Sequence, residues 1–161
     1  MDFFLCLVAS TAMESVNPDV ADNLSEGSAQ NFEVMPIPTS GTVLIVDDNQ
    51  DNLELASFIA EQQGIQVLLA SSAQEVFPQL NQPIDLILLD IVLPDIDGFT
   101  LLKQLRQSNL LSASVPVVAV TALASEREKR RIEAAGFSGY LAKPYTIEAL
   151  EQILQQPYRI S

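Results

Sequence analysis

The sequence predicts an α/β fold in which a five-stranded parallel sheet is covered by helices on both faces. From Thr42 onward, apolar runs of strand length alternate five times with amphipathic segments of helix length, which is typical of such a sheet. The runs are almost wholly apolar, as strands buried on both faces must be. A chain of 161 residues is long enough for one domain with a substantial core and too short for two of ordinary size.

The predicted strands and helix starts can be placed in chain order. The strands are the apolar runs at residues 43–46, 65–69, 86–89, 115–120 and 140–142. Polar side chains that can accept from backbone N–H groups mark the starts of four of the five helices. These are Ser72 with Glu75 as a capping box, Asp97 or Gly98, Ser125 with Glu128 as a second capping box, and Thr146.

Glycine and proline mark where the predicted helices end or bend. Gly64 follows the first helix and Gly136 the fourth, each as a left-handed terminator, and Pro157 should stop the fifth. Pro78 falls inside the second helix, where it deletes one backbone hydrogen bond and clashes with the preceding turn. That helix is therefore predicted to be short or kinked.

Polar residues follow four of the five predicted strands. They are Asp47 and Asp48 after the first, Asp90 after the third, Thr121 after the fourth and Lys143 after the fifth. In an open parallel α/β sheet, ligands bind beyond the carboxyl ends of the strands, where the strand order reverses. With the flavodoxin-like order 2-1-3-4-5, the second strand lies at the outer edge and the four polar-ended strands are contiguous. The sequence therefore predicts that these side chains converge.

The chemistry of this set points to phosphoryl transfer. Each residue alone has an ordinary explanation as a turn, cap, strand or surface residue. Three crowded carboxylates, however, repel one another unless a cation lies among them, and oxygen ligands favour Mg²⁺ or Mn²⁺. A carboxylate beside such a metal can attack a phosphoryl group and form an aspartyl phosphate. The metal, an ammonium and a hydroxyl would then stabilise the phosphoryl oxygens.

Four motifs carry a resemblance to a known family. VLIVDDN, LILLDIVLPDIDG, VVAVTA and YLAKP, in this order and spacing, resemble the receiver domain of two-component response regulators, the CheY-like family, over about residues 42–156. The resemblance implies that Asp90 takes a phosphoryl group from a sensor histidine kinase or a histidine phosphotransfer protein. It also implies a signalling switch rather than an enzyme, with Mg²⁺-dependent self-phosphorylation and autodephosphorylation as its only chemistry.

The same resemblance assigns a role to each motif residue. For Mg²⁺ it implies Asp48, Asp90 and the backbone carbonyl of Val92 as ligands, with Asp47 acting through water. Lys143 matches the active-site cation, Thr121 the hydroxyl that moves toward the phosphoryl group, and Tyr140 the aromatic that turns inward with the switch. Pro144 matches the proline that follows a cis peptide bond, and Pro94 and Gly98 fit the loop after the acceptor.

Other functional classes fit less well. A phosphatase of the haloacid-dehalogenase type would need Asp-x-Asp after the first strand, but Asp47 and Asp48 are adjacent and Asn49 stands where the second acid is needed. A nucleotide-binding enzyme would need a glycine-rich phosphate loop, and neither G-x-x-x-x-G-K nor G-x-G-x-x-G occurs. An unphosphorylated receiver-like protein-binding module shares the fold and stays open as the alternative.

Composition limits partners and location. Eight Lys plus Arg against 21 Asp plus Glu give a net charge of −13, which disfavours direct binding to DNA or to an anionic membrane. The single cysteine, Cys6, cannot form an internal disulfide, and a chain without histidine lacks the usual zinc ligands. A cytoplasmic location is expected.

The chain divides into an acidic arm at residues 1–40, predicted to be disordered, a receiver domain at 41–157 and a tail at 158–161. The arm has six acids, no base and, from Thr11 onward, no sustained apolar period. The apolar run at residues 3–9 follows Asp2 rather than a positive region, and it is far shorter than the ~20 residues that span a bilayer. A targeting signal, a docking segment and a disordered end stay open, as does a later start at Met35.

Two further features concern signal lifetime and partners. Val92 and Leu123 are apolar where many relatives have a polar residue, so an attacking water finds no hydrogen-bond partner there and a long-lived phosphorylated state is predicted.

Residues 126–131 hold four of the eight bases. This run is either a solvated helix face or a docking site for an acidic partner or a second copy, the latter giving a homodimer through the 125–156 face. With only residues 157–161 after the fifth helix, a stand-alone regulator or phosphorelay intermediate acting on another, unidentified protein is expected.

Overall fold

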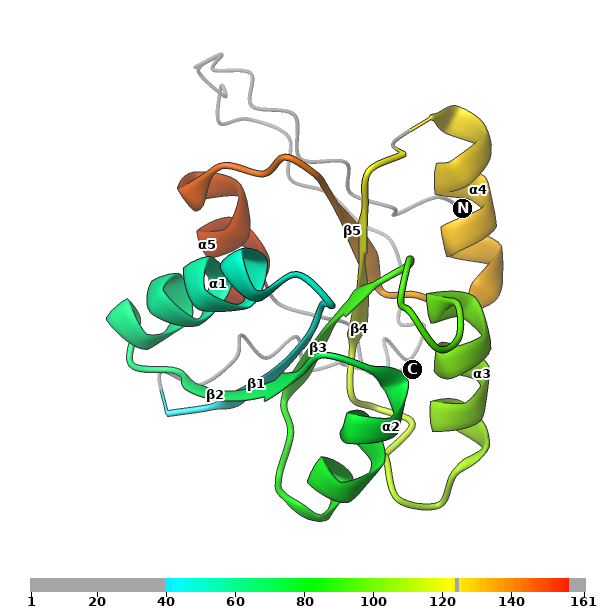
Figure 1. The fold of residues 1–161 in the computed structure, drawn as a ribbon, viewed down its shortest axis with the longest axis horizontal. Coiled ribbons are helices and arrows are strands. Elements are labelled where there is room, and N and C mark those ends of the chain that lie inside the picture. The colour runs from blue at the N-terminus through cyan, green and yellow to red at the C-terminus, as the bar shows by residue number, and fades with distance from the viewer. Residues whose placement is uncertain (1–39, 124, 157–161) are drawn as a thin grey trace, which may run out of the picture.

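The computed structural model describes residues 40–123 and 125–156, and these form a parallel sheet with helices on both faces (Figure 1). In chain order the elements are β1 (Thr42–Val46), α1 (Gln50–Gln62), β2 (Gln66–Ala70), α2 (Ala73–Val76), the 3₁₀ helix η1 (Phe77–Asn81), β3 (Leu86–Asp90), α3 (Gly98–Gln107), β4 (Val117–Thr121), α4 (Glu126–Ala135), β5 (Gly139–Ala142) and α5 (Ile147–Gln155). The strands pair in parallel in the order β2-β1-β3-β4-β5. The predicted fold class and strand order are confirmed.

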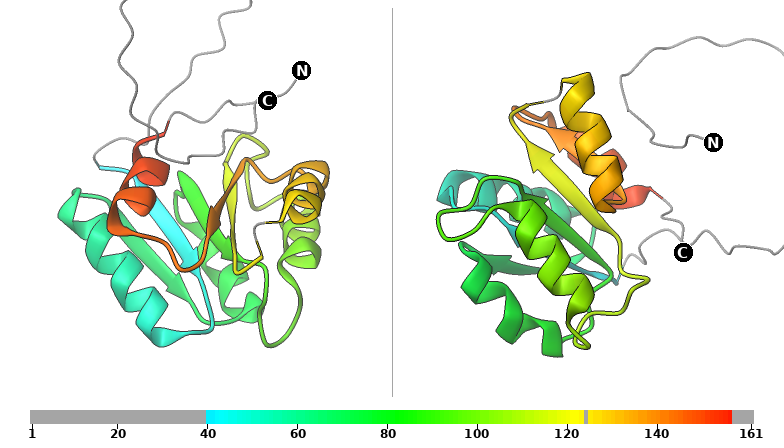
Figure 2. Two further views of the ribbon diagram at one scale, coloured as in Figure 1. Left: turned by 90° about the horizontal axis from the view of Figure 1, so that it is seen from above. Right: turned by 90° about the vertical axis from the view of Figure 1, so that its right-hand side faces the viewer.

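The two faces of the sheet have separate cores because successive strand residues point to opposite sides. On one face, Val43, Leu86 and Val118 pack with buried residues of α1 and α5. On the other face, Leu44 and Ile87 pack with buried residues of α2, α3 and α4. The left view in Figure 2 shows this three-layer arrangement.

The degree of burial separates the central strands from the edge. Every residue of β1, β3 and β4 is buried, as the apolar runs predict. β2 is less buried than predicted, and Leu69 is 38% exposed. The reason is its position at the edge of the sheet, where it pairs on one side alone. The central strands therefore form the rigid frame behind the polar strand ends.

Strand bounds differ from prediction by one or two residues. β4 begins at Val117 rather than at residue 115, because the Val115 N–H donates to the Ser112 carbonyl in a turn (3.1 Å) and Pro116 has no N–H for a ladder. β2 begins and ends one residue later than predicted, and β5 begins one residue earlier.

Most predicted helix ends are confirmed. The side chains of Asp97, Ser125 and Thr146 cap α3, α4 and α5 by accepting from backbone N–H groups. Gly64 and Gly136 have φ values of 77° and 92°, the left-handed conformation predicted for them. Asn49, which directly follows the two acids, is the cap of α1.

The capping box predicted for the second helix is wrong. The Ser72 side chain makes no capping hydrogen bond, and the Glu75 carboxylate accepts from the backbone N–H of Ser71 instead (2.7 Å). α2 has only four residues and continues into η1 at Pro78, so the predicted short or kinked helix is confirmed.

Some predictions fall on residues 1–39 and 157–161, outside the described residues. They concern the acidic arm, the apolar run at residues 3–9, Pro157 as a stop signal and the tail. Across residues 40–123 and 125–156, no helix combines the length and apolar character needed to cross a membrane.

Candidate functional site

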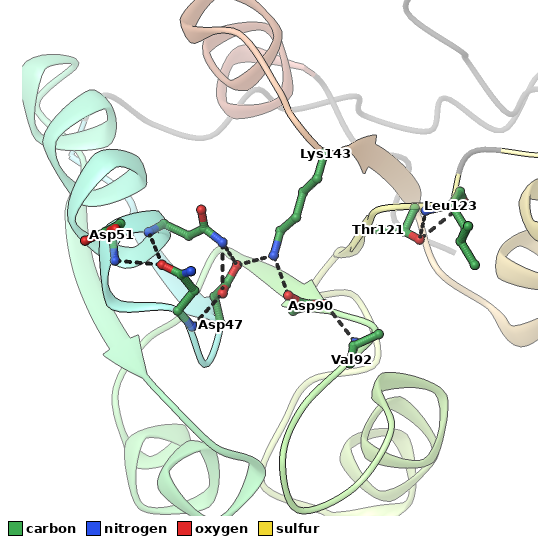
Figure 3. Close-up of polar contacts among 9 residues, drawn as sticks. Asp47, Asp51, Asp90, Val92, Thr121, Leu123 and Lys143 are labelled. Atoms are coloured by element: carbon green, nitrogen blue, oxygen red, sulfur yellow. Dashed lines mark hydrogen bonds and ion pairs between the residues drawn. The ribbon is translucent and has the colours of Figure 1, made fainter.

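The candidate site lies at the carboxyl ends of four neighbouring strands. Asp47 and Asp48 follow β1, Asp90 is the last residue of β3, Thr121 is the last of β4, and Lys143 follows β5. Asp90 pairs with Val120 in the sheet and Thr121 with Ala142, so the parallel register brings these strand ends level. Figure 3 shows Asp47, Asp90 and Lys143 pointing toward one another.

Three carboxylates are gathered here. Asp47, Asp48 and Asp90 each offer one oxygen, and these oxygens lie within 4.8 Å of one another. Asp47 and Asp90 are buried, whereas Asp48 is exposed. Such a set fits a hard divalent cation, since Mg²⁺ prefers carboxylate oxygens and keeps other positions open for phosphate.

The carboxylates of Asp47 and Asp48 differ in the number of hydrogen bonds that they accept from the protein. Both oxygens of Asp47 accept from the Asn52 side-chain amide (3.2 and 3.1 Å), and Oδ1 also accepts from the Asn49 N–H (2.9 Å). The Asp48 carboxylate has no hydrogen-bond partner among the residues that the structure describes. A metal could therefore bind the Asp48 carboxylate directly and the Asp47 carboxylate through water.

Lys143 is the cation at the centre of the site. Its Nζ donates to Asp47 Oδ2 (2.6 Å) and Asp90 Oδ2 (2.5 Å). Burial works to lower the pKa of Lys143, but the hydrogen bonds and charges of the two carboxylates outweigh it and raise the pKa. Lys143 is therefore charged at neutral pH.

For Asp90, burial has a larger effect on the pKa than the hydrogen-bond partners have. Its burial raises the pKa of its carboxyl, and this effect exceeds the lowering by Lys143 and by the Val92 N–H, which donates to Asp90 Oδ1 (2.7 Å). The nearby charge of Asp47 raises it further. Ionised Asp90 is therefore held at an energetic cost that an added cation would relieve.

The backbone on both sides of the site is closely constrained. A Cβ on Gly98 would lie 2.7 Å from the Asp90 carbonyl oxygen and 2.9 Å from Ile91 Cα, so a side chain would clash with backbone. The Lys143 N–H donates to the Thr121 carbonyl (2.8 Å), which aims Lys143 from the end of β5. The Lys143–Pro144 peptide bond is cis, as the resemblance implies.

The two predicted switch residues, Thr121 and Tyr140, make contacts with Leu123 and Lys129 in this structure. The Thr121 hydroxyl accepts from the Leu123 N–H (3.1 Å) and donates to the Leu123 carbonyl (3.3 Å), and Figure 3 shows this pair apart from the Asp90 and Lys143 contact. Tyr140 is half-buried, and the Lys129 ammonium lies 5.7 Å from the centre of its ring. Val92 and Leu123 are 71% and 68% exposed at the rim of the site.

Three contributing residues are absent from the sequence-based prediction. Asn52 lies in the first turn of α1, and its side-chain amide donates to the Asp47 carboxylate. The sequence signal for this contact is that Asn52 follows Asp47 by five residues. Tyr145 directly follows the Lys143–Pro144 bond, and burial, followed by the charge of Asp47, raises the pKa of its hydroxyl. Asp95 contacts a distant helix, for which no local signal exists.

Comparisons with known proteins agree with this geometry. The family model described as response regulator receiver domain matches residues 43–155. The chain is 40% identical over 114 residues to the signal transduction histidine-protein kinase BarA of Escherichia coli K12, a match that covers 70% of this chain and 12% of BarA.

Solved structures give the same answer. The chemotaxis response regulator CheY4 of Vibrio cholerae matches with a TM-score of 0.67 and 27% identity, covering 71% of this chain and 96% of that one. The receiver domain of sensor histidine kinase PA1611 of Pseudomonas aeruginosa PAO1 matches with a TM-score of 0.63 and 31% identity, covering 71% and 94%. In that structure a magnesium ion is coordinated in the active site cleft.

Fold, strand-end residues and family match agree on one class, the CheY-like signalling proteins of two-component systems. The chain belongs to the response regulator receiver domain family.

Proposed function

We propose that this protein is a phosphoacceptor response regulator, in which Asp90 takes a phosphoryl group from a histidine kinase or histidine phosphotransfer protein. The observation that carries the proposal is the buried Asp90 carboxylate at the end of β3, in contact with Lys143 and beside two further acids. The match to histidine kinases such as BarA supports a partner of that kind.

The proposed metal ligands are Asp48, Asp90 and the backbone carbonyl of Val92, with Asp47 acting through water. The oxygen-only donor set fits Mg²⁺, and Mn²⁺ is the second choice. When bound, the metal would supply positive charge to the phosphoryl oxygens.

The transfer step needs an ionised Asp90. One Asp90 oxygen attacks the phosphorus, a new O–P bond forms, and the bond between phosphorus and the donor's histidine nitrogen breaks. Lys143 favours the carboxylate form against the effect of burial. Its ammonium then neutralises charge that develops on a phosphoryl oxygen.

The proposed switch begins at Thr121. Its hydroxyl would leave the Leu123 backbone and donate to a phosphoryl oxygen, and Tyr140 would turn inward into the space released. Because Tyr140 lies against Lys129, this motion would reach α4 and bias a pre-existing equilibrium at the surface formed by α4, β5 and α5.

Fewer of the α4 bases are available to a partner than the run of four suggests. The Arg131 guanidinium lies 3.9 Å from the centre of the Phe99 ring, and Lys129 lies over Tyr140, so both have intramolecular contacts. We propose Arg127 and Arg130, which are exposed, as the residues for an acidic partner or a second copy.

Exchanging Arg127 and Arg130 together for Glu tests this surface, because neither change removes the Arg131 contact with Phe99. Loss of self-association or partner binding on phosphorylation, measured by analytical ultracentrifugation, is expected. Unaltered association would leave α4 as a solvated face.

Location and other partners follow from the proposed chemistry. We propose a cytoplasmic protein, because histidine kinases draw their phosphoryl groups from ATP. No direct DNA binding and no membrane insertion are proposed, since the net charge of −13 repels both phosphate backbones and anionic lipids.

The function is tested by incubating the purified protein with acetyl phosphate and Mg²⁺ and following its intact mass. A phosphoryl adduct is expected that disappears when Mg²⁺ is chelated and is absent in Asp90→Asn. No adduct in the unmodified protein would contradict the proposal and favour the unphosphorylated protein-binding module. Catalytic turnover of a phosphate monoester would instead indicate an enzyme.

A further inference from the structure

The loop between β3 and α3, residues 91–97, is tied to its neighbours on two sides. On one side, the Ile91 N–H donates to the Val120 carbonyl of β4 (3.0 Å). On the other side, the Asp95 carboxylate accepts from α2: Oδ1 from the Ala73 N–H and Oδ2 from the Gln74 N–H, both at 3.1 Å. The loop therefore bridges β4 and α2.

Asp95 serves as the cap that α2 lacks. The first N–H groups of a helix have no partner within the helix, and a side-chain oxygen just before it usually accepts from them. Ser72 holds that position but makes no capping bond. Asp95, 22 positions further along the chain than Ala73, takes its place. Burial works to raise the pKa of Asp95, but the backbone N–H groups that donate to it together outweigh burial and lower the pKa, so the cap is a charged carboxylate.

The remaining contacts of the loop fix its two ends. The Gly98 N–H donates to the Ile91 carbonyl (2.8 Å), which closes the loop, and Leu93 is buried in the core. Val92, by contrast, is 71% exposed, and its N–H donates to Asp90 Oδ1 (2.7 Å). The Val92 carbonyl is also a proposed metal ligand. The placement of the Val92 carbonyl thus depends on the path of residues 92–95, which buried Leu93 holds on the core side and Asp95 holds at α2.

We propose that Asp95 is a positioning residue: by capping α2 from within the loop, it fixes the path of residues 92–95 and so orients Val92 toward Asp90. The expected effect of Asp95 on Mg²⁺ binding rests on the proposed function. The effect of Asp95 on the order of the loop does not depend on that function. Since such coupling is reciprocal, a displacement of the start of α2 would also disturb the loop.

The variants are Asp95→Ala and Asp95→Asn, which keeps one carbonyl acceptor. Asp85→Ala is the matched control, because Asp85 Oδ2 also accepts from a distant backbone N–H, that of Thr42 (2.8 Å), but at the amino-terminal end of the strands. Hydrogen exchange of individual N–H groups is measured by NMR in metal-free protein. We expect exchange at Val92 and Gly98 to rise about ten-fold in Asp95→Ala and less in Asp95→Asn, with no change at these positions in Asp85→Ala.

If exchange rises only at Ala73 and Gln74, Asp95 is merely a helix cap and the proposal is overturned. A rise across all β1 and β3 N–H groups in Asp95→Ala would reflect general destabilisation. Asp95→Asn then decides whether Asp95 positions the loop or only caps α2: exchange that rises at Val92 and Gly98 supports positioning, and exchange that rises only at Ala73 and Gln74 overturns it.

Calorimetric titration with Mg²⁺ is the second measurement. We expect several-fold weaker binding in Asp95→Ala and unchanged binding in Asp85→Ala. Equal Mg²⁺ affinity of Asp95→Ala and the unmodified protein would overturn the positioning role. Failure of the unmodified protein to bind Mg²⁺ or to become phosphorylated would instead contradict the proposed function, and the exchange data would still decide the order of the loop.

Discussion

The two ends of the central strands both carry carboxylates but use them differently. At the amino-terminal end, the Asp85 carboxylate accepts from the Thr42 N–H and the Asp85 N–H donates to the Thr42 carbonyl, both at 2.8 Å. At the carboxyl-terminal end, Asp47, Asp48 and Asp90 lie within 4.8 Å of one another. Both arrangements satisfy backbone groups, since Asp47 accepts from the Asn49 N–H and Asp90 from the Val92 N–H, but the second also gathers three negative charges in one place.

This difference separates Asp85, a carboxylate that stabilises the fold, from Asp90, for which we propose a functional role. Asp90 is buried with a raised pKa, so its ionised form is disfavoured in the folded state relative to the unfolded chain. Proteins keep such arrangements at functional sites, where perturbed ionisation serves chemistry.

Lys143→Ala should have the largest effect. Removing the ammonium that contacts Asp90 should slow phosphorylation by acetyl phosphate in saturating Mg²⁺ about 100-fold, the usual effect of losing one charge-stabilising group. The control is Lys103→Ala, which removes an exposed lysine of α3. An unchanged rate in a folded Lys143→Ala protein would make this lysine only a structural partner of the acids.

Asp85→Ala should act on stability alone. Loss of the bond to the Thr42 N–H, which belongs to a buried residue, should lower the free energy of unfolding in urea by about 1–2 kcal/mol. The rate of phosphorylation should stay the same. A slower reaction would show that the two ends of the strands are not independent.

Asp90→Asn should stabilise the metal-free protein. A folded-state pKa above the ordinary value means that stability is full at low pH and is lost as the pH rises through that pKa. Asn does not titrate, so at neutral pH the variant should be more stable than the unmodified protein, and the difference should vanish in acid.

Added Mg²⁺ should reverse the order of the two proteins, because it binds the folded unmodified protein more tightly. Urea unfolding at several pH values, with and without Mg²⁺, measures both effects. A less stable Asp90→Asn protein without metal would contradict the assigned cost of ionised Asp90.

Val92→Asn should have the smallest effect. An amide at this exposed position gives an attacking water a hydrogen-bond partner, and the lifetime of the phosphorylated protein should fall about three-fold. Leu110→Asn, at another exposed apolar position, is the control. An unchanged lifetime, followed by intact mass after the phosphodonor is removed, would show that Val92 does not protect the phosphoryl group.

Among the helix caps, the correct predictions from sequence are those with local signals. The caps Asp97, Ser125 and Thr146 bond N–H groups two or three residues away, so their spacing is visible in the sequence. The cap of α2 lies 22 positions away, and the local pattern of Ser72 with Glu75 therefore gave a wrong answer. A cap supplied by tertiary structure has no signature of its own in one chain.

The candidate site shows the same division. Strand order and strand ends predicted that Asp47, Asp90 and Lys143 would meet, because parallel register brings the ends level. The orientation of the Thr121 hydroxyl toward Leu123 and the reach of Asn52 to Asp47 depend on side-chain rotamers, which strand periodicity does not encode.

Calorimetric titration of the metal-free protein with Mg²⁺ tests most directly the central claim that the three acids form a cation site. Asp48→Ala is the decisive comparison, because Asp48 is exposed and its carboxylate bonds none of the described residues, so its loss should leave the fold intact. We expect binding of a single Mg²⁺ that weakens at least about ten-fold in Asp48→Ala. No binding to the unmodified protein, or equal binding to both, would contradict it.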